Sequence, residues 1–235
     1  DADIPIDFDD MLLQEPKKEL HDFFVKYEMK SFIKETMNTE EVKKEGSRKI
    51  VNKFSSHLLC DDAFIFANLD NENYYDATLY GFAISKDDET EYVRFEDALK
   101  DEAFMAWLLS DNHKAVYDAK NFYHALHKHH IPFSKVSFDV MIAAFLVDGT
   151  LSDYDKLAEK YQFDRSLLKD DVFGKKGKPK LVDDQLAADY AMIQADHLQD
   201  LVSILNESLQ DMEMMDLFNT IEMPLTYVLY AMEKE

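Results

Sequence analysis

The sequence predicts an α/β domain in which helices flank a mixed β-sheet. Three short apolar segments joined by polar turns come early in the chain, and this pattern is typical of an antiparallel meander. Strand-like and helix-like segments then alternate before a final series of helices, as expected for an α/β fold. The 235 residues include only 5 glycines and 5 prolines, which favours long helices with few tight turns.

Each element is predicted from the spacing of its apolar residues. Residues 62–69 form a nearly continuous apolar run, which is typical of a strand buried on both faces. Apolar residues at intervals of three and four indicate the helices. The expected strands are 62–69, 77–85, 90–95, 114–118 and 135–139; the expected helices are 16–35, 96–111, 118–130, 139–147, 153–161, 182–209 and one beginning near Pro224, with a loop at 169–180.

The composition limits the environment of the chain. Hydrophobic residues make up 46% of it, which is enough for a substantial core. The single cysteine, Cys60, excludes an internal disulfide and fits a reducing compartment. No run of 18 apolar residues occurs and no signal peptide is recognised, so we expect no membrane span and a cytoplasmic location.

The charge of the chain argues against broad contact with nucleic acid. A net charge of −22 arises from 48 acidic and 26 basic residues, and such a surface should repel phosphate over most of its area. A DNA contact would need a local basic patch. The candidates form one lysine-rich run, whose alternative interpretation is an ordinary solvated loop: Lys175, Lys176, Lys178 and Lys180.

The histidine-rich stretch HALHKHH is a candidate metal site. His124 and His127 would share a helix face, and His129 and His130 follow them. Nothing nearby in the sequence completes four ligands, so solvated histidines at a helix end are the expected alternative. Cys60 has no accompanying pattern of a thiol nucleophile, and no glycine-rich phosphate loop is present.

Several stretches occur in the order of a known family. They are DFDDMLLQEPKKELHDFFVKYEMKSFI, SFDVMIAAFLVDG, LAEKY and NTIEMPLTYVLYAMEKE. With them the chain resembles the bacterial DNA polymerase I family (family A) along its whole length, as a segment of a longer protein. The resemblance implies a C-terminal tail of a 5′-nuclease domain at 1–35, a 3′–5′ exonuclease-like domain at 59–218 and the start of a polymerase domain at 219–235. The polar residues 36–58 are expected to be a linker.

The resemblance implies a ribonuclease-H-like 3′–5′ exonuclease fold with a five-stranded mixed sheet. Proofreading members of the family hold two divalent metal ions with four carboxylates. These come from Asp-x-Glu on the first strand, an Asp after a short strand, and Tyr-x-x-x-Asp on a late helix. The two metal ions clamp the attacking and leaving oxygens while water cleaves the 3′-terminal phosphodiester.

The first two acid positions of this pattern hold no carboxylate in the present sequence. Residues two apart on a strand point the same way, so Asp-x-Glu would direct two carboxylates at one metal. The best match of FIFANL places Ala67 and Leu69 there, and a shift by one residue would place Phe66 and Asn68 there. Neither alignment supplies an anionic ligand.

The remaining two acid positions are also substituted. Counting back from SFD places the third acid at Phe122, and in YAMIQAD the tyrosine is retained as Tyr190 while the acid position is Gln194. Glutamine is uncharged and is a poor ligand for Mg²⁺. The resemblance therefore predicts that this segment has no catalytic residue, binds no metal and is inactive as a nuclease.

Four other acids leave an alternative open. Asp70 and Glu72 form an Asp-x-Glu in the turn beyond the first strand, and Asp118 ends a strand where it would also cap a helix. Asp196 lies two residues after Gln194, which is about 200° around a helix. An active metal-dependent 3′–5′ exonuclease built from these displaced acids is the alternative hypothesis; an independent acidic interaction module is a third.

The expected function is structural. The segment is expected to support the polymerase domain through intramolecular contact, to use no cofactor and to bind DNA weakly or not at all. The resemblance implies that the parent is a DNA-directed DNA polymerase of replication and repair, that it binds DNA, and that its polymerase domain needs Mg²⁺.

Overall fold

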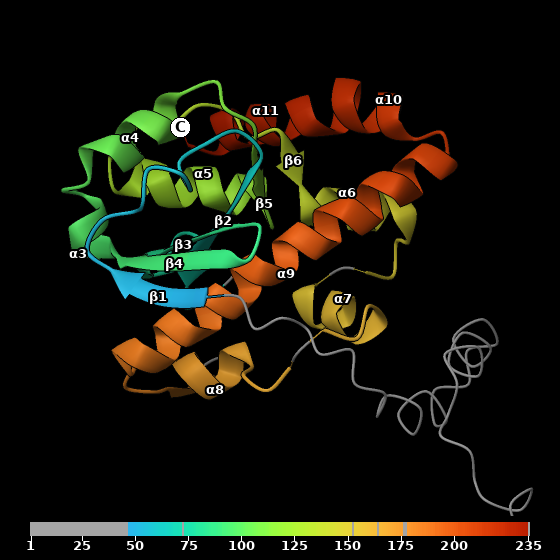
Figure 1. The fold of residues 1–235 in the computed structure, drawn as a ribbon. Coiled ribbons are helices and arrows are strands. Elements are labelled where there is room, and N and C mark those ends of the chain that lie inside the picture. The colour runs from blue at the N-terminus through green and yellow to red at the C-terminus, as the bar shows by residue number, and fades with distance from the viewer. Residues whose placement is uncertain (1–46, 72, 152, 164, 176–177, 235) are drawn as a thin grey trace, which may run out of the picture. The chain divides into compact units, whose positions relative to one another are not determined.

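The computed structural model of the protein describes residues 47–71, 73–151, 153–163, 165–175 and 178–234. Its centre is a six-stranded mixed sheet with helices on both faces (Figure 1). The strands lie in the order β1-β4-β3-β2-β5-β6. They are β1 (Ser47–Val51), β2 (Ala63–Leu69), β3 (Leu79–Lys86), β4 (Glu89–Arg94), β5 (Lys114–Val116) and β6 (Phe138–Asp139).

Helices make up most of the remaining described chain. They are α3 (Phe95–Ala98), α4 (Glu102–Leu109), α5 (Ala119–Lys128), α6 (Val140–Val147), α7 (Tyr154–Lys160), α8 (Lys169–Phe173), α9 (Asp184–Asp211), α10 (Met215–Leu217), the π-helical turn η2 (Phe218–Glu222) and α11 (Met223–Glu233). None of the helices described is long and apolar enough to cross a membrane. The helix expected at 16–35, together with the 5′-nuclease tail assigned to 1–35, lies outside the described residues.

The predicted meander and mixed sheet are confirmed. β3 pairs antiparallel with both β2 and β4, whereas β5 pairs parallel with both β2 and β6. The carboxyl ends of β2 and β5 therefore meet at one edge of the sheet, followed by the turn after β2 and the start of α5. In α/β sheets this edge is the usual place for a binding site.

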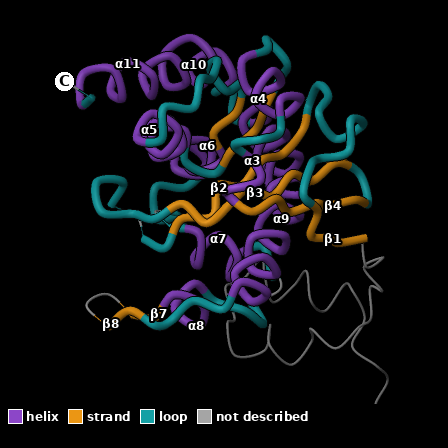
Figure 2. Tube along the Cα trace, turned by 90° about the vertical axis from the view of Figure 1, so that its left-hand side faces the viewer, coloured by secondary structure: helices purple, strands orange, loops and turns teal. Residues whose placement is uncertain are grey.

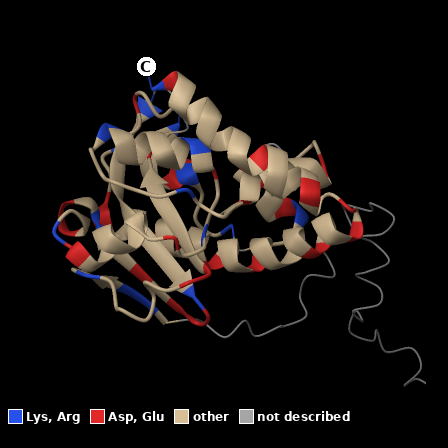
Figure 3. Cartoon of the chain, turned by 90° about the horizontal axis from the view of Figure 1, so that it is seen from above, with Lys and Arg blue, Asp and Glu red and all other residues tan. Residues whose placement is uncertain are grey.

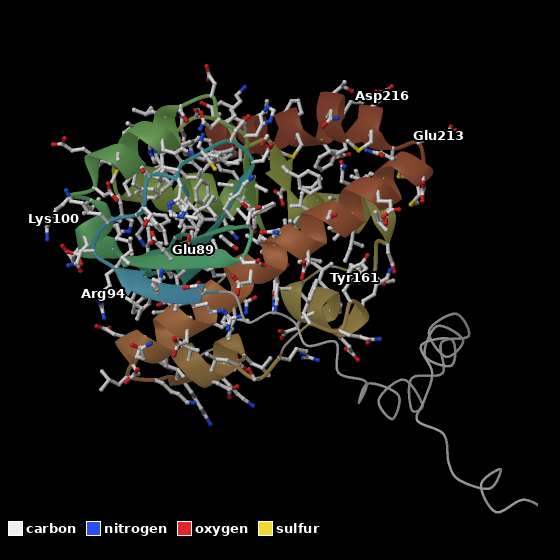
Figure 4. All side chains as sticks on the ribbon, viewed as in Figure 1. Glu89, Arg94, Lys100, Tyr161, Glu213 and Asp216 are labelled. Carbon is white, nitrogen blue, oxygen red and sulfur yellow. The ribbon has the colours of Figure 1, made fainter. Side chains whose placement is uncertain are left out.

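The sheet has six strands and not the expected five, because β1 lies within the range predicted as a linker. β1 pairs parallel with β4 at the edge of the sheet. Its sequence SRKIV lacks an apolar alternation, and its first three residues are exposed. Backbone pairing with β4 and one ion pair hold it: Lys49 Nζ lies 3.1 Å from the carboxylate of Glu89, which Figure 4 labels. His57, beyond the strand, contacts the same carboxylate through Nε2 at 2.6 Å.

Two further expectations about helices are wrong. The helix predicted at 96–111 is divided into α3 and α4, because Asp101 begins a new helix by accepting a hydrogen bond from the Phe104 N–H. The loop predicted at 169–180 contains α8 and a hairpin of β7 (Gly174–Lys175) and β8 (Lys178–Pro179). This hairpin lies beside α8, apart from the main sheet (Figure 2).

The two faces of the sheet are covered in different ways. On one face, large side chains form the main core, for example Phe82 of β3 against Phe104 of α4 at a ring distance of 5.1 Å. On the other face, the long helix α9 packs closely on β3 and β4 through small residues (Figure 1). Ala188, Ala191 and Ala195 of α9 are fully buried there. The short side chains let the helix approach the sheet.

Aspartates at helix starts account for part of the large acidic content. Five helices in the described part of the chain begin with an aspartate whose carboxylate accepts a backbone N–H from the first turn. Aspartate is among the best N-cap residues because it satisfies donors that the helix leaves unpaired. These residues are Asp101, Asp118, Asp139, Asp153 and Asp183.

Candidate functional site

A cavity of about 470 Å³ opens where the parallel strands β2 and β5 end. Its walls come from segments that are distant in sequence: the end of β2 and the following turn, the start of α5, and single residues of α6, α7, α8 and α9. The sheet edge supplies the floor and the helices supply the sides. This is the position in which the resemblance implies a proofreading site.

The end of β2 presents apolar side chains to the cavity. Ala67 and Leu69 both line it, as does Phe66. Asn68 is fully buried on the side of α9, where its Nδ2 donates to the Ala187 carbonyl at 2.9 Å. An irregularity in the β2–β3 pairing falls between Asn68 and Leu69. Both alignments considered for the first two acids thus select uncharged residues, and Asn68 is not among those that line the cavity.

The start of α5 supplies Asp118 and Phe122. Asp118 lines the cavity and caps α5, accepting hydrogen bonds from Asn121 N at 3.0 Å and Asn121 Nδ2 at 2.6 Å. Phe122, one turn later, lines the same cavity but is 3% exposed and belongs to the core. The side chain at this position therefore contributes packing.

Asp139 lies buried behind the start of α5. Its carboxylate accepts hydrogen bonds from Ala119 N at 2.8 Å and Met141 N at 2.9 Å, so it joins the first turns of α5 and α6. Burial raises the pKa of this carboxyl group well above its usual value, and the negative charge of Asp118 raises it further. Asp139 does not line the cavity, and its role is to hold the two helices.

On α9, Tyr190 and Gln194 lie one turn apart. Tyr190 lines the cavity and packs edge-on against Phe66 and Phe173, both at 6.0 Å. Gln194 is 3% exposed, and its Oε1 has no hydrogen-bond partner within the described protein. It borders a small adjacent cavity of about 10 Å³, which Tyr190 and Lys169 also line. The amide is therefore next to the main cavity and not part of its wall.

The charged side chains around the cavity balance one another. Among the described residues that line it, Asp118 and Asp153 are acidic and Lys120 and Lys169 are basic. Asp153 caps α7 and lies 3.4 Å from Lys156 Nζ. The described lining thus carries no net formal charge.

Of the other acids considered from the sequence, two lie away from the cavity. Asp70 closes the turn after β2 by accepting the Thr78 N–H at 2.9 Å. Asp196 accepts from Arg48 Nε at 2.7 Å and from Ser85 and Thr90, which fastens α9 to the strands. Glu72 lies outside the described residues. Asp118 alone of the described alternatives reaches the cavity.

The lysine-rich run does not join the cavity. Lys175 and Lys178 face each other in the register of the β7–β8 hairpin, and both are exposed. Lys180 is exposed and its Nζ donates to the Asp171 carbonyl at 3.2 Å. Lys176 lies outside the described residues.

The histidines do not converge on a common point. His124 is 6% exposed, stacks on Tyr74 at a ring distance of 3.7 Å and lies 3.0 Å from Glu233 Oε2 of α11. The expectation of solvated histidines is wrong for this residue, because α11 covers it. His127 and His130 are exposed, and His129 packs on Phe95.

A separate group of possible cation ligands lies at the opposite ends of β2 and β5. Ligand atoms of Asp61, Asp62 and His113 all lie within 4.8 Å of one another. These three residues directly precede the two strands, whereas the cavity lies beyond the strand ends. All three are exposed. Half-buried Cys60 adjoins them, and its Sγ donates to the Asp61 carbonyl.

Several cavity residues were missed by sequence reasoning. Lys120 lies on α5 between Asp118 and Phe122, whereas Asp153, Tyr154 and Lys169 come from the starts of α7 and α8, where the family motif has no acid position. A signal for Asp153 was present, because an aspartate before YDKLAEK is a typical N-cap. Nothing in the local sequence indicates that Lys169 reaches the cavity at the ends of β2 and β5.

Solved structures identify the fold. The structure titled "Brucella melitensis NrnC" aligns with a TM-score of 0.59, covering 79% of this chain and 93% of that one at 18% identity. The "POL domain of Pol1 from M. smegmatis complex with DNA primer-template and dNTP" aligns with a TM-score of 0.57, covering 75% of this chain and 29% of that one at 22% identity. Together with a family-model match over residues 65–201, these likenesses make the domain ribonuclease-H-like, of the exonuclease type.

Comparison with protein families makes the assignment specific. Residues 65–201 match the model of the "DNA polymerase I, ribonuclease H-like domain". The chain therefore belongs to this family, and the predicted resemblance is confirmed. DNA polymerase I of Bacillus caldotenax is 27% identical over 241 residues, covering 99% of this chain. The chain spans 28% of the length of that relative.

Proposed function

We propose that this chain is a non-catalytic 3′–5′ exonuclease-like segment of a DNA polymerase I, and that it supports the polymerase domain of the parent protein. The observation that carries the proposal is the cavity at the ends of β2 and β5. Ala67, Leu69 and Phe122 line it at positions where the resemblance implies carboxylates. Gln194 lies behind it at the remaining position.

The donor chemistry of the cavity does not suit a pair of divalent ions. Two Mg²⁺ ions carry four positive charges and need several anionic oxygen ligands. Moving them from water into an apolar pocket without such ligands has a desolvation free energy that the remaining contacts do not offset. The described lining offers two carboxylates, which both cap helices, and Lys120 and Lys169 oppose their charge. These residues would therefore not hydrolyse a phosphodiester by a two-metal mechanism.

One observation favours the alternative of an active exonuclease. Asp118 and Asp153 line the same cavity, so two carboxylates do face a common space. The same two residues have a sufficient structural role as N-caps, and this favours the non-catalytic proposal. A nuclease assay separates the two hypotheses.

The parent protein would perform template-directed DNA synthesis in replication and repair in the bacterial cytoplasm. Its polymerase domain would bind Mg²⁺ and DNA, and this strongly acidic segment would contribute little DNA affinity. The support is the family membership and the relatives of greater length. The polymerase activity belongs to residues outside the present sequence.

The proposal is tested by incubating the 235-residue chain with Mg²⁺ or Mn²⁺ and 5′-labelled single-stranded DNA. We expect no shortening from the 3′ end, under conditions in which an active proofreading exonuclease degrades the DNA. Metal-dependent shortening that is lost in Asp118→Asn or Glu72→Gln would establish the alternative.

A further inference from the structure

Two aspartates and a histidine meet at the ends of β2 and β5 that lie opposite the cavity. Asp61 and Asp62 directly precede β2, and His113 directly precedes β5. Because β2 and β5 run parallel and Ala63 pairs with Lys114, the residues just before the two strands lie side by side. One ligand atom from each of the three side chains lies within 4.8 Å of the other two. The strand pairing thus brings together possible metal ligands from two segments that are distant in sequence.

The spacing of these ligand atoms suits a small divalent ion. His113 Nδ1 lies 3.4 Å from Asp62 Oδ1 and 4.0 Å from Asp61 Oδ1. Two ligand atoms at about 2.1 Å from a tetrahedral zinc ion are separated by roughly 3.4 Å. The first distance already has this value, and the second needs a small rotation of an exposed side chain. The three side chains can therefore reach a common ion without movement of the main chain.

The main chain that carries these side chains is held in place by contacts outside the strands. Lys86 Nζ donates to the Asp61 carbonyl at 3.3 Å and to the Asp62 carbonyl at 3.0 Å. The backbone N–H of His113 donates to Asp61 Oδ1 at 2.5 Å, which joins the two segments directly. Groups that are fixed before binding lose little conformational entropy when a ligand arrives.

The donor set selects the class of ion. Carboxylate oxygens bind many divalent cations, whereas an imidazole nitrogen favours zinc, nickel and similar transition ions over Mg²⁺ and Ca²⁺. The histidine thus distinguishes this group from an ordinary cluster of acidic side chains. We propose that Asp61, Asp62 and His113 form a surface site for a divalent ion of the zinc class, with water at the remaining coordination positions. The site is separate from the cavity, so it does not depend on the proposed function.

The charge of the chain favours a cation at this site, although one neighbour opposes it. The net charge is −22, and acidic residues are spread widely over the described chain (Figure 3). Such a field raises the local concentration of cations at the surface. The ammonium group of Lys86 offsets one of the two carboxylate charges. All three ligands are exposed, so water also solvates the bound ion.

The single tryptophan of the chain gives a local signal for binding at this site. Trp107 is 4% exposed, and its Nε1 donates to the Cys60 carbonyl at 2.8 Å, one peptide bond away from Asp61. Co²⁺ has unpaired d electrons and quenches indole emission at short range, whereas Zn²⁺ has a filled d shell and does not. Binding at the site is therefore detected through Trp107, while binding at a distant surface histidine is not.

The test is a titration of the metal-free 235-residue chain with Co²⁺, read by tryptophan emission and followed by an excess of Zn²⁺. We expect quenching that saturates at an equimolar amount of Co²⁺ and is reversed by Zn²⁺, because both ions use the same ligands. His113→Asn and Asp62→Asn should each weaken Co²⁺ binding by at least about tenfold, since even substitutions of groups that only support metal ligands have effects of this size.

The matched control is His130→Asn, which removes another exposed histidine and should leave the titration unchanged. Asp62 and His130 both have a φ of 56°, and asparagine tolerates this left-handed conformation. Neither substitution therefore strains the backbone, and circular dichroism of each variant checks that it is folded.

Four results would overturn the inference. Quenching that does not saturate would show that Co²⁺ meets the surface only by collision. Quenching that is retained in both His113→Asn and Asp62→Asn would place the ion elsewhere, and quenching that is lost in His130→Asn would place it at the end of α5. A crystal soaked in Zn²⁺ should show an anomalous peak among the three side chains, and the absence of that peak would also refute the site.

Discussion

At the scale of single residues, Asp118 shows how an acid can lie in a nuclease-like cavity without serving a metal. Its carboxylate accepts hydrogen bonds from the backbone and side chain of Asn121 at the first turn of α5. An N-cap at this position is needed for α5 whether or not the cavity binds a metal ion. The stability of the helix is therefore enough to explain the residue.

This explanation predicts the effect of two substitutions. Asp118→Ala should lower the free energy of unfolding by about 1 kcal/mol, because the Asn121 N–H loses its partner. Asp118→Asn should lower it by much less, since asparagine is an equally good N-cap. Urea unfolding of both variants checks the difference. Equal losses would mean that the negative charge, and not the cap, is what the protein uses.

Sequence reasoning reached some of the cavity residues and not others. Ala67, Leu69 and Tyr190 were found because the family motif fixes their spacing along a strand and a helix. Lys120 and Lys169 were not found, because no motif includes them and their position depends on how separate helices pack. Side chains brought together only by tertiary structure leave no local pattern.

At the scale of elements, the strands and helices with a clear apolar period were predicted within a few residues. β1 was missed because an exposed edge strand is held by backbone pairing and carries no apolar pattern. The division between α3 and α4 was missed because the apolar spacing continues across it, although Asp101 is a recognisable N-cap. Elements stabilised by hydrogen bonds are thus harder to predict than those stabilised by burial.

The pairing of β3 with β4 depends on a glycine. A Cβ atom at Gly81 would lie 2.4 Å from the Val93 carbonyl oxygen and 2.5 Å from the Tyr92 hydroxyl. Gly81→Ala should therefore destabilise the protein by roughly 1–3 kcal/mol through overpacking. Gly149→Ala is the control, since its Cβ would meet Phe145 at an ordinary 3.8 Å. Thermal unfolding that ranks the two variants in the opposite order would refute this account of the sheet.

The attachment of α11 to α5 should depend on pH. Burial lowers the pKa of His124, although Glu233 partly opposes the effect, and Lys120 and His127 act in the same direction as burial. Because the folded pKa lies below the unfolded value of about 6.5, the stabilising contribution is complete above that pH and is lost as the pH falls.

We therefore expect the free energy of unfolding to decrease as the pH falls from about 7.5 through the unfolded pKa of about 6.5. His124→Phe should show a smaller decrease, because phenylalanine keeps the stacking on Tyr74 but does not titrate. Some decrease should remain, since burial also lowers the pKa of His129. A pH dependence identical to that of the unsubstituted chain would exclude His124 as its source.

At the scale of the whole molecule, the fold and the family were accessible from the sequence, whereas the state of the cavity depends on three-dimensional packing. The order of strands and helices predicted the mixed sheet, and short motifs predicted the family. The charge balance of the cavity required the positions of α5, α7 and α8. The structure also explains part of the acidic composition, because several of the aspartates cap the N-termini of helices.

The central claim is that the cavity beside Ala67 and Asp118 does not hold a pair of divalent ions. The most direct test is a crystal of the protein soaked in Mn²⁺, in which anomalous scattering locates the metal. We expect no anomalous peak inside the cavity, and a peak at the exposed group of Asp61, Asp62 and His113 would not bear on the claim. Two peaks about 4 Å apart in the cavity, bound by carboxylates such as Asp118 and Asp153, would contradict it.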